Sequence, residues 1–170
     1  WTAIARAQLT TFEPDHVVFS YHGLPERHIR NCDPTGSHCL ASSNCCDHYM
    51  DANPNCYKAQ CYATTRGLIE RLKLSEGSYT LAFQSKLGKD PWITPATDTT
   101  VEKLAQDGEQ KVAVLSPAFV ADCIETIEEL GMQARDSFLD HGGKELKLLS
   151  SLNAEEVWVD AFTQILEESL

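Results

Sequence analysis

The sequence has no low-complexity tract, few basic residues and no hydrophobic run approaching the roughly 20 residues that cross a bilayer. Its opening, WTAIARAQLTTFEPDH, lacks the basic region and apolar core of a secretion signal. Only 14 Lys and Arg stand against 25 Asp and Glu, a net charge of -11. That balance disfavours nucleic acid and anionic membranes as partners, because both carry negative charge. We expect a cytoplasmic protein that binds no nucleic acid.

The sequence also contains no CxxC pair, although it has seven cysteines. Six of them lie between Cys32 and Cys61, and Cys123 stands alone. The missing CxxC argues against a zinc ribbon and against a thioredoxin-type redox pair. In a reducing compartment, thiols grouped this closely are more often metal or cluster ligands than disulfides. The spacing itself favours neither a 2Fe-2S cluster nor zinc.

The chain of 170 residues predicts one domain, residues 1–170. Short β-branched and aromatic runs alternate with amphipathic segments, which predicts parallel strands joined by crossover helices. We expect strands at residues 16–20, 79–85, 111–117 and 144–150, and helices at about 59–74, 95–108, 121–138 and the C-terminus. The predicted fold is a Rossmann-like, three-layer α/β/α sandwich with about four parallel strands. Residues from about 31 to 58 show no periodicity, which predicts an insertion rich in cysteine.

Two helix starts are predicted from their capping residues. Thr99 and Glu102 have the spacing of a capping box. Asn153, with Glu156 three residues later, predicts the N-cap of the terminal helix. The apolar residues of that helix should form one face. They are Val157, Phe162, Ile165 and Leu166.

Chemistry-bearing side chains follow the predicted strands, where ligands of parallel sheets bind. His22 ends the first strand, and an imidazole there is either a base or metal ligand, or an ordinary loop histidine. Asp122, Glu125 and Glu129 are spaced i, i+3, i+7 and should share one helical face. Such a row is either a solvated stripe or a site for a divalent metal such as iron.

A second polar strand exit is FQSKLGKDPWITPATD. Gln84, Ser85 and Lys86 precede an apolar corner that contains Trp92. This mixture is either an ordinary turn before a helix or a surface for a flat apolar ligand with carboxylate arms.

Three motifs together resemble one family. VVFSYHGLPE is similar to the FSxHxLP signature of ferrochelatases, which insert ferrous iron into a porphyrin to make haem. FQSKLGKDPWITPATD and LSPAFVADCIETIEEL resemble the family's second and third motifs, in the family's order. The resemblance is to the C-terminal half of an enzyme built from two α/β halves. The chain, which opens on Trp rather than Met, is therefore expected to need a missing N-terminal domain and to be inactive alone.

The resemblance also implies residue roles. His22 and Glu125 would be catalytic and would bind the metal from opposite sides of the porphyrin, and which of them accepts the pyrrole protons is left open. Asp122 and Glu129 would belong to the same acidic metal path. Residues implied in binding the porphyrin are Leu24, Pro25, Gln84, Ser85, Lys86 and Trp92.

Some ferrochelatases carry a 2Fe-2S cluster, and a minority of bacterial members resemble this chain in having an internal cysteine-rich insert. The implied ligands are four of Cys32, Cys39, Cys45, Cys46 and Cys56, with zinc as the alternative group. Cys61 is interpreted as an ordinary residue at a helix start. Two rival interpretations remain, a cobalt or nickel chelatase-type domain and a non-catalytic metal- or cluster-binding module.

Overall fold

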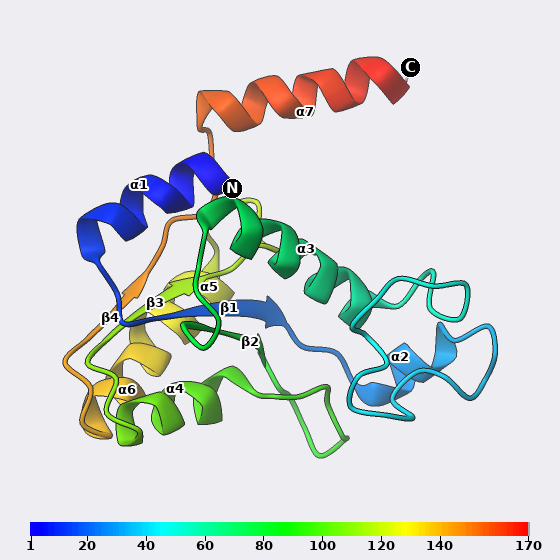
Figure 1. The fold of residues 1–170 in the computed structure, drawn as a ribbon, viewed down its shortest axis with the longest axis horizontal. Coiled ribbons are helices and arrows are strands. Elements are labelled where there is room, and N and C mark those ends of the chain that lie inside the picture. Colours follow the sequence, from blue (N-terminus) through cyan, green and yellow to red (C-terminus); the bar gives the residue numbers. More distant parts are fainter. Residues whose placement is uncertain (170) are drawn as a thin grey trace.

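The computed structural model describes residues 1–169 and contains a parallel sheet with helices on both faces (Figure 1). Its strands are β1 (His16–His22), β2 (Tyr79–Gln84), β3 (Lys111–Leu115) and β4 (Glu145–Leu148). They lie in the order β2-β1-β3-β4, and all pairings are parallel. The predicted α/β fold with a four-stranded parallel sheet is therefore confirmed.

Helices pack on both faces of this sheet. The helices of residues 1–169 are α1 (Thr2–Phe12), α2 (Glu26–Asn31), α3 (Tyr57–Leu72), α4 (Thr97–Gln106), α5 (Ile124–Ile127), the π-helix η1 (Glu129–Ala134), α6 (Arg135–Asp140) and α7 (Glu156–Ser169). Helices α1 and α3 cover one face, while α4, η1 and α6 cover the other (Figure 1). Neighbouring residues of β1 serve opposite cores, because side chains alternate along a strand. Phe19 packs toward α1 and α3, whereas Val18 packs toward α4 and α6.

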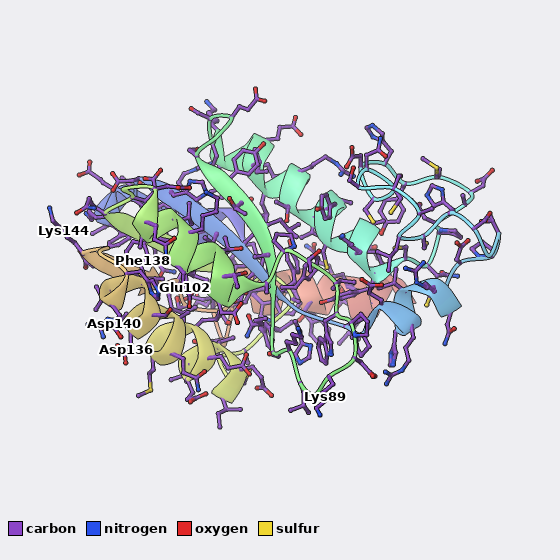
Figure 2. All side chains as sticks on the ribbon, turned by 90° about the horizontal axis from the view of Figure 1, so that it is seen from below. Lys89, Glu102, Asp136, Phe138, Asp140 and Lys144 are labelled. Atoms are coloured by element: carbon purple, nitrogen blue, oxygen red, sulfur yellow. The ribbon has the colours of Figure 1, made fainter. Side chains whose placement is uncertain are left out.

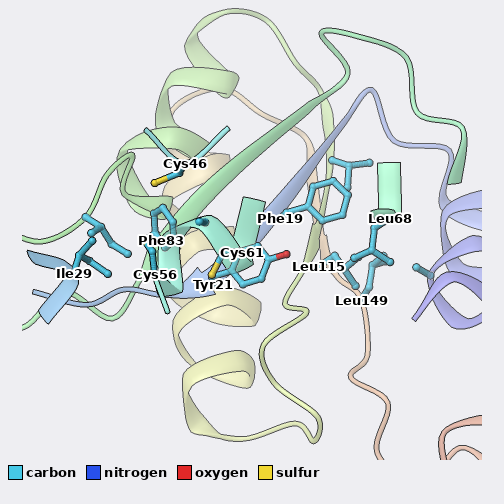
Figure 3. Close-up of a cluster of buried hydrophobic side chains, with 14 of the residues drawn as sticks. Phe19, Tyr21, Ile29, Cys46, Cys56, Cys61, Leu68, Phe83, Leu115 and Leu149 are labelled. Atoms are coloured by element: carbon cyan, nitrogen blue, oxygen red, sulfur yellow. The ribbon is translucent and has the colours of Figure 1, made fainter. Parts of the chain in front are cut away.

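The cysteine-rich segment belongs to the first of these cores. Between Asn31 and Tyr57 the chain forms turns without helix or strand. Even so, the side chains of Cys46, Cys56 and Cys61 are buried and extend the apolar cluster that contains Phe19 (Figure 3). The insert is thus a packed element and not a free loop.

Side-chain hydrogen bonds hold the turns of the insert. The carboxylate of Asp33 accepts the backbone N–H groups of Thr35, His38 and Cys39 at 2.7 to 2.8 Å. Asn53 is fully buried, and its amide N–H donates to the carbonyl oxygen of Cys45 at 3.1 Å. Burial of Asn53 is tolerated because its side-chain amide and oxygen both have partners.

The predicted capping box of α4 is wrong. The helix begins at Thr97, with Ala96 at the N-cap, and no side chain caps it. Thr99 lies inside the first turn, where its hydroxyl donates to the carbonyl oxygen of Ala96 at 3.2 Å. A residue inside the helix cannot cap it, so the spacing of Thr99 and Glu102 placed the N-cap three residues beyond the observed one, Ala96.

The predicted N-cap of the terminal helix is wrong as well. Helix α7 begins at Glu156, so Asn153 lies too far upstream to cap it. The side-chain amide of Asn153 donates instead to the carboxylate of Asp122 at 2.7 Å. A tertiary contact has taken the side chain that the local pattern assigned to the helix.

The segment after β3 departs from the single helix expected over residues 121–138. Helix α5 begins only at Ile124, and the backbone changes to a π-helix at Glu129. The N–H of Gln133 donates to the carbonyl oxygen of Glu128, five residues earlier, at 2.9 Å. Asp122 precedes the first turn, so the expected row of three carboxylates on one helical face is wrong. Such π segments are rare and often mark functional sites.

Helix α7 stands away from the sheet and its covering layers (Figure 1). The predicted apolar residues are present on it, but none is buried. Val157 and Ile165 are each 56% exposed. Across residues 1–169, the helices are all too short or too polar to cross a membrane.

Candidate active site at the carboxyl ends of the strands

His22 is the last residue of β1 and pairs with Gln84 of β2 at the edge where both strands end. Its Nδ1 lies 2.7 Å from the carbonyl oxygen of Gly23. A carbonyl oxygen only accepts, so Nδ1 carries the proton and the lone pair of a neutral ring is on Nε2. Among residues 1–169, Nε2 has no hydrogen-bond partner. This nitrogen is available to a proton or to a metal ion.

Two aromatic rings flank His22. The ring centroids of Trp92 and Phe119 lie 6.4 and 6.3 Å from that of the imidazole. Gly23 permits the approach of Trp92, because a Cβ at this position would lie 3.0 Å from the indole ring and 2.8 Å from the carbonyl oxygen of Gln84. The imidazole thus lies close to two partly exposed aromatic rings, which suit contact with a flat apolar ligand.

The backbone next to His22 also holds the Trp92 segment. The N–H of Ile93 donates to the carbonyl oxygen of Leu24 at 3.0 Å, and Pro25 forms an isolated bridge with Trp92. The predicted residues Leu24, Pro25 and Trp92 are therefore brought together by backbone contacts.

Glu125 lies in the first turn of α5, half-buried and within electrostatic reach of His22. A hydrogen bond from the Cys123 side chain lowers the pKa of Glu125, its own backbone N–H lowers it further, and the charge of His22 adds to the effect. The carboxylate is therefore ionised over the range in which His22 titrates. A carboxylate and an imidazole that face one edge can each take a proton or bind a metal ion.

Glu129, at the start of η1, is fixed by the exit of β2. Its Oε2 accepts the Ser85 hydroxyl at 2.6 Å and the Gln84 amide at 3.2 Å. The same Gln84 amide donates to the main-chain oxygen of Glu125 at 2.7 Å, and its side-chain oxygen accepts the buried Ser20 hydroxyl at 2.9 Å. Gln84 thus joins β1, β2, α5 and η1, and it sets Glu125 and Glu129 relative to His22.

Asp122 takes a different direction from the other two carboxylates. It accepts the Asn153 amide at 2.7 Å and the Ser151 N–H at 3.2 Å. Partial burial would raise the pKa of Asp122, but the hydrogen bonds from Asn153 and Ser151 outweigh it and the net shift is downward. Asp122 joins the loops after β3 and β4, and its oxygens are already used.

A cavity of about 340 Å³ opens beside the Gln84 network, on the side of α4 and α6. Its lining includes Gln84, Ser85, Lys86, Thr97 and Glu129. On this side the Ser137 hydroxyl donates to Glu102 at 3.0 Å and joins the two helices. Figure 2 labels Glu102 on α4 and Phe138 on α6 from this direction.

Four of the five candidate cysteine ligands share one buried pocket of the insert, and they are Cys39, Cys45, Cys46 and Cys56. The sulfurs of Cys45 and Cys46 are 3.5 Å apart. Hydrogen bonding from the Cys46 thiol lowers the pKa of Cys56 to about 5, with help from the backbone N–H of Ala59. The fifth candidate, Cys32, is exposed.

No disulfide forms among these cysteines. Within residues 1–169, no set of three or more His, Cys, Asp or Glu side chains has the arrangement of a metal site as it stands. Cys61 is buried beside the Tyr57 hydroxyl, and burial raises the pKa of its thiol to about 12. The predicted cysteine ligands other than Cys32 are thus buried in one cluster, but their thiols do not have the arrangement of a metal site.

The sequence predicts that Phe119 lies at the ligand-binding edge, because it follows the third strand, but no pattern marked its ring as a neighbour of His22. Tyr57 was not predicted as a residue of the site. Tyr57 donates its hydroxyl to the main-chain oxygen of His22 at 2.8 Å across 35 residues of sequence. No local pattern signals a contact of that range.

The family model described as Ferrochelatase matches residues 1–170. The ferrochelatase of Stutzerimonas stutzeri (strain A1501) is 46% identical over 152 residues, covering 89% of this chain and 45% of that protein. That of Bdellovibrio bacteriovorus (strain ATCC 15356 / DSM 50701 / NCIMB 9529 / HD100) is 42% identical over 155 residues, covering 91% and 45%. That of Coxiella burnetii (strain Dugway 5J108-111) is 41% identical over 169 residues, covering 99% and 48%. The chain spans about half the length of the curated relatives it matches.

Proposed function

Because this chain belongs to the ferrochelatase family, we propose that it forms the C-terminal part of an enzyme that inserts Fe(II) into a porphyrin to make haem. The observation that carries the proposal is the setting of His22. Its imidazole lies close to the Trp92 and Phe119 rings and within reach of the Glu125 charge, and its Nε2 has no hydrogen-bond partner among residues 1–169. A planar substrate between a base and a carboxylate is the arrangement that metal insertion needs.

Insertion requires that two pyrrole nitrogens lose their protons and that iron loses its water ligands. His22 accepts a proton at Nε2, because Nδ1 is already occupied by the carbonyl of Gly23. Glu125, held ionised, either binds the iron or accepts the second proton. Glu129 stays in place through Ser85 and Gln84 and adds negative charge on the same side. Asp122 supports the loops, because its oxygens are used by backbone and amide groups.

The predicted porphyrin contacts divide into apolar and polar groups. Leu24, Pro25 and Trp92 offer an apolar surface beside His22. Gln84 and Ser85 donate hydrogen bonds to Glu129. Their role toward the substrate is therefore indirect, through the position of that carboxylate. Lys86 is exposed at the same strand exit and pairs with a carboxylate arm of the macrocycle.

The remaining part of the enzyme supplies the second wall of the porphyrin site. In this proposal residues 1–170 form one domain, with the cysteine-rich insert at about 31–58 inside it. The curated relatives are about twice as long, and the apolar face of α7 is uncovered by residues 1–169. A second half packed there would bury Phe162 and Ile165, which are 45% and 56% exposed. The isolated chain is then inactive, because the porphyrin has only one wall.

The insert holds a 2Fe-2S cluster, with zinc as the alternative. Support comes from the donors: four thiols lie together in one pocket, and the lowered pKa of Cys56 favours a thiolate. Their side chains must turn to surround the group. A bound cluster would crosslink the turns of the insert. Anaerobic purification followed by a visible spectrum and iron and acid-labile sulfide assays tests this. A colourless product that contains zinc would contradict the proposal of a 2Fe-2S cluster.

The chelatase proposal is tested in the full-length enzyme by following the loss of porphyrin fluorescence as iron enters. His22→Ala should abolish iron insertion, because the edge then lacks its free nitrogen. The matched control is His28→Ala, an exposed histidine of α2 that should leave turnover unchanged. Normal turnover in His22→Ala would show that the site has been misassigned.

A further inference from the structure

A single side chain joins the cysteine-rich insert to the candidate base. Tyr57 is the first residue of α3, and its hydroxyl donates to the main-chain oxygen of His22 at 2.8 Å. The hydroxyl is partly buried, and burial raises the pKa of Tyr57, so it remains a donor at every working pH. The imidazole and the oxygen belong to one residue, so a displacement of the oxygen tilts the ring.

The residue before Tyr57 belongs to the thiol group. Cys56 is fully buried at the N-cap of α3, in the same buried cluster as Cys39 and Cys46. Thiols of Cys39 and Cys46 approach it from the turns of the insert. Figure 3 labels Cys46 and Cys56 in the buried cluster that also contains Tyr21, the neighbour of His22 in β1. A change at the Cys56 sulfur therefore occurs one peptide away from the tether.

The geometry points to a coupling: we propose that Tyr57 is a positioning residue that transmits the state of the grouped thiols to His22. This inference rests on the proposed function, since it concerns the same candidate base. When the thiols are bridged, Cys56 shifts, the first turn of α3 follows, and the Tyr57 hydroxyl moves the His22 carbonyl. Two packed elements with a shared hydrogen bond are the kind of connection through which sites become coupled.

The probe is phenylarsine oxide, which bridges two thiols and leaves imidazoles and carboxylates alone. Two As–S bonds form, the As–O bond is lost, and the two thiol protons leave with that oxygen as water, without oxidation or reduction. A metal ion would be a poorer probe, because it could also bind His22. Mass spectrometry counts the adducts on the reduced chain.

The readout is the imidazole Cε1–Hε1 signal of His22 in the NMR spectrum of the isotopically labelled chain, assigned by its loss in His22→Gln. The adduct should move this signal by more than its line width in the wild-type chain. It should not move it in Tyr57→Phe, which lacks only the tethering hydroxyl. The matched control is Tyr62→Phe on the same helix, whose hydroxyl has no hydrogen bond to His22 within residues 1–169 and which should respond like wild type.

A second perturbation avoids the arsenical. Cys56→Ser should displace the His22 signal in the otherwise unchanged chain, whereas Cys32→Ser, at an exposed thiol, should not. In the double variant Cys56→Ser/Tyr57→Phe, the part due to Cys56 should vanish. Equal displacement with and without the Tyr57 hydroxyl, or none in wild type, overturns the coupling. The readout needs no turnover, so it can fail or succeed independently of the iron-insertion assay on His22→Ala.

Discussion

The substitution Gly23→Ala tests the construction of the site most directly. The added methyl group would lie 2.8 Å from the carbonyl oxygen of Gln84 and 3.0 Å from Cε3 of Trp92. The oxygen cannot retreat easily, because it accepts the Gly23 N–H at 2.8 Å beside the pairing of β1 with β2. The indole must therefore move away from His22, and its own hydrogen bond to the Leu87 oxygen at 3.1 Å is strained.

Overpacking of this kind costs about 1–3 kcal/mol. For a domain of this size each kcal/mol lowers Tm by roughly 2–4 °C, so we expect a fall of several degrees. Iron insertion by the full-length enzyme should fall more than stability alone explains, because the Trp92 wall is displaced from the imidazole.

Urea unfolding followed by circular dichroism measures the change in the free energy of unfolding, with wild type measured alongside. The matched control is Gly67→Ala in the middle of α3, where an added Cβ meets nothing within 4 Å. That variant should gain roughly 0.5–1 kcal/mol, because alanine favours a helix over glycine. If Gly23→Ala were as stable as wild type, the close approach of Trp92 to the strand end would be refuted.

Three further substitutions probe the framework. Asp122→Asn should lower the free energy of unfolding at pH 7. The pKa of Asp122 is lowered in the folded state, so its charge stabilises the fold above the unfolded pKa, and this effect is lost as pH drops through the folded pKa. Urea titrations should therefore show the difference from wild type shrinking below about pH 4. Gly143→Ala should lose about 1–3 kcal/mol, because its Cβ would collide with the buried Phe138 ring, and an unchanged Tm would contradict this packing. Tyr21→Phe removes a buried hydrogen bond of 2.8 Å to Thr65 and should cost about 1–3 kcal/mol in thermal unfolding, whereas a neutral result would mean that Thr65 finds another partner.

Periodicity predicted the layers and the edge of the sheet that holds His22, because strand and helix patterns depend on near neighbours. It failed where contacts between distant residues decide the structure. The amide of Asn153 bonds Asp122 across 31 residues instead of capping α7. Tyr57 reaches His22 across an insertion that has no period at all.

The helix after β3 failed for another reason. A π turn has no residue signature of its own, since one extra residue per turn leaves the amino-acid types unchanged. The row of Asp122, Glu125 and Glu129 was drawn on an ideal α-helix, and the actual backbone separates its members. The sequence identified these three carboxylates as candidates. It could not show the directions of their side chains, because these depend on the irregular backbone after β3.

The π segment η1 also allows the Glu129 carboxylate to face Ser85 while later apolar side chains face the core, which one regular helix could not do. Successive residues of an α-helix are rotated by about 100°, so the direction of Glu129 would dictate those of Ala134 and Phe138. With a wider turn between them, the carboxylate faces Ser85 while the apolar side chains still enter the core. Deleting one residue there would restore a regular helix and force a choice between charge placement and packing. The extra residue acts as an angular adjustment between the acidic edge and the helix layer beneath it.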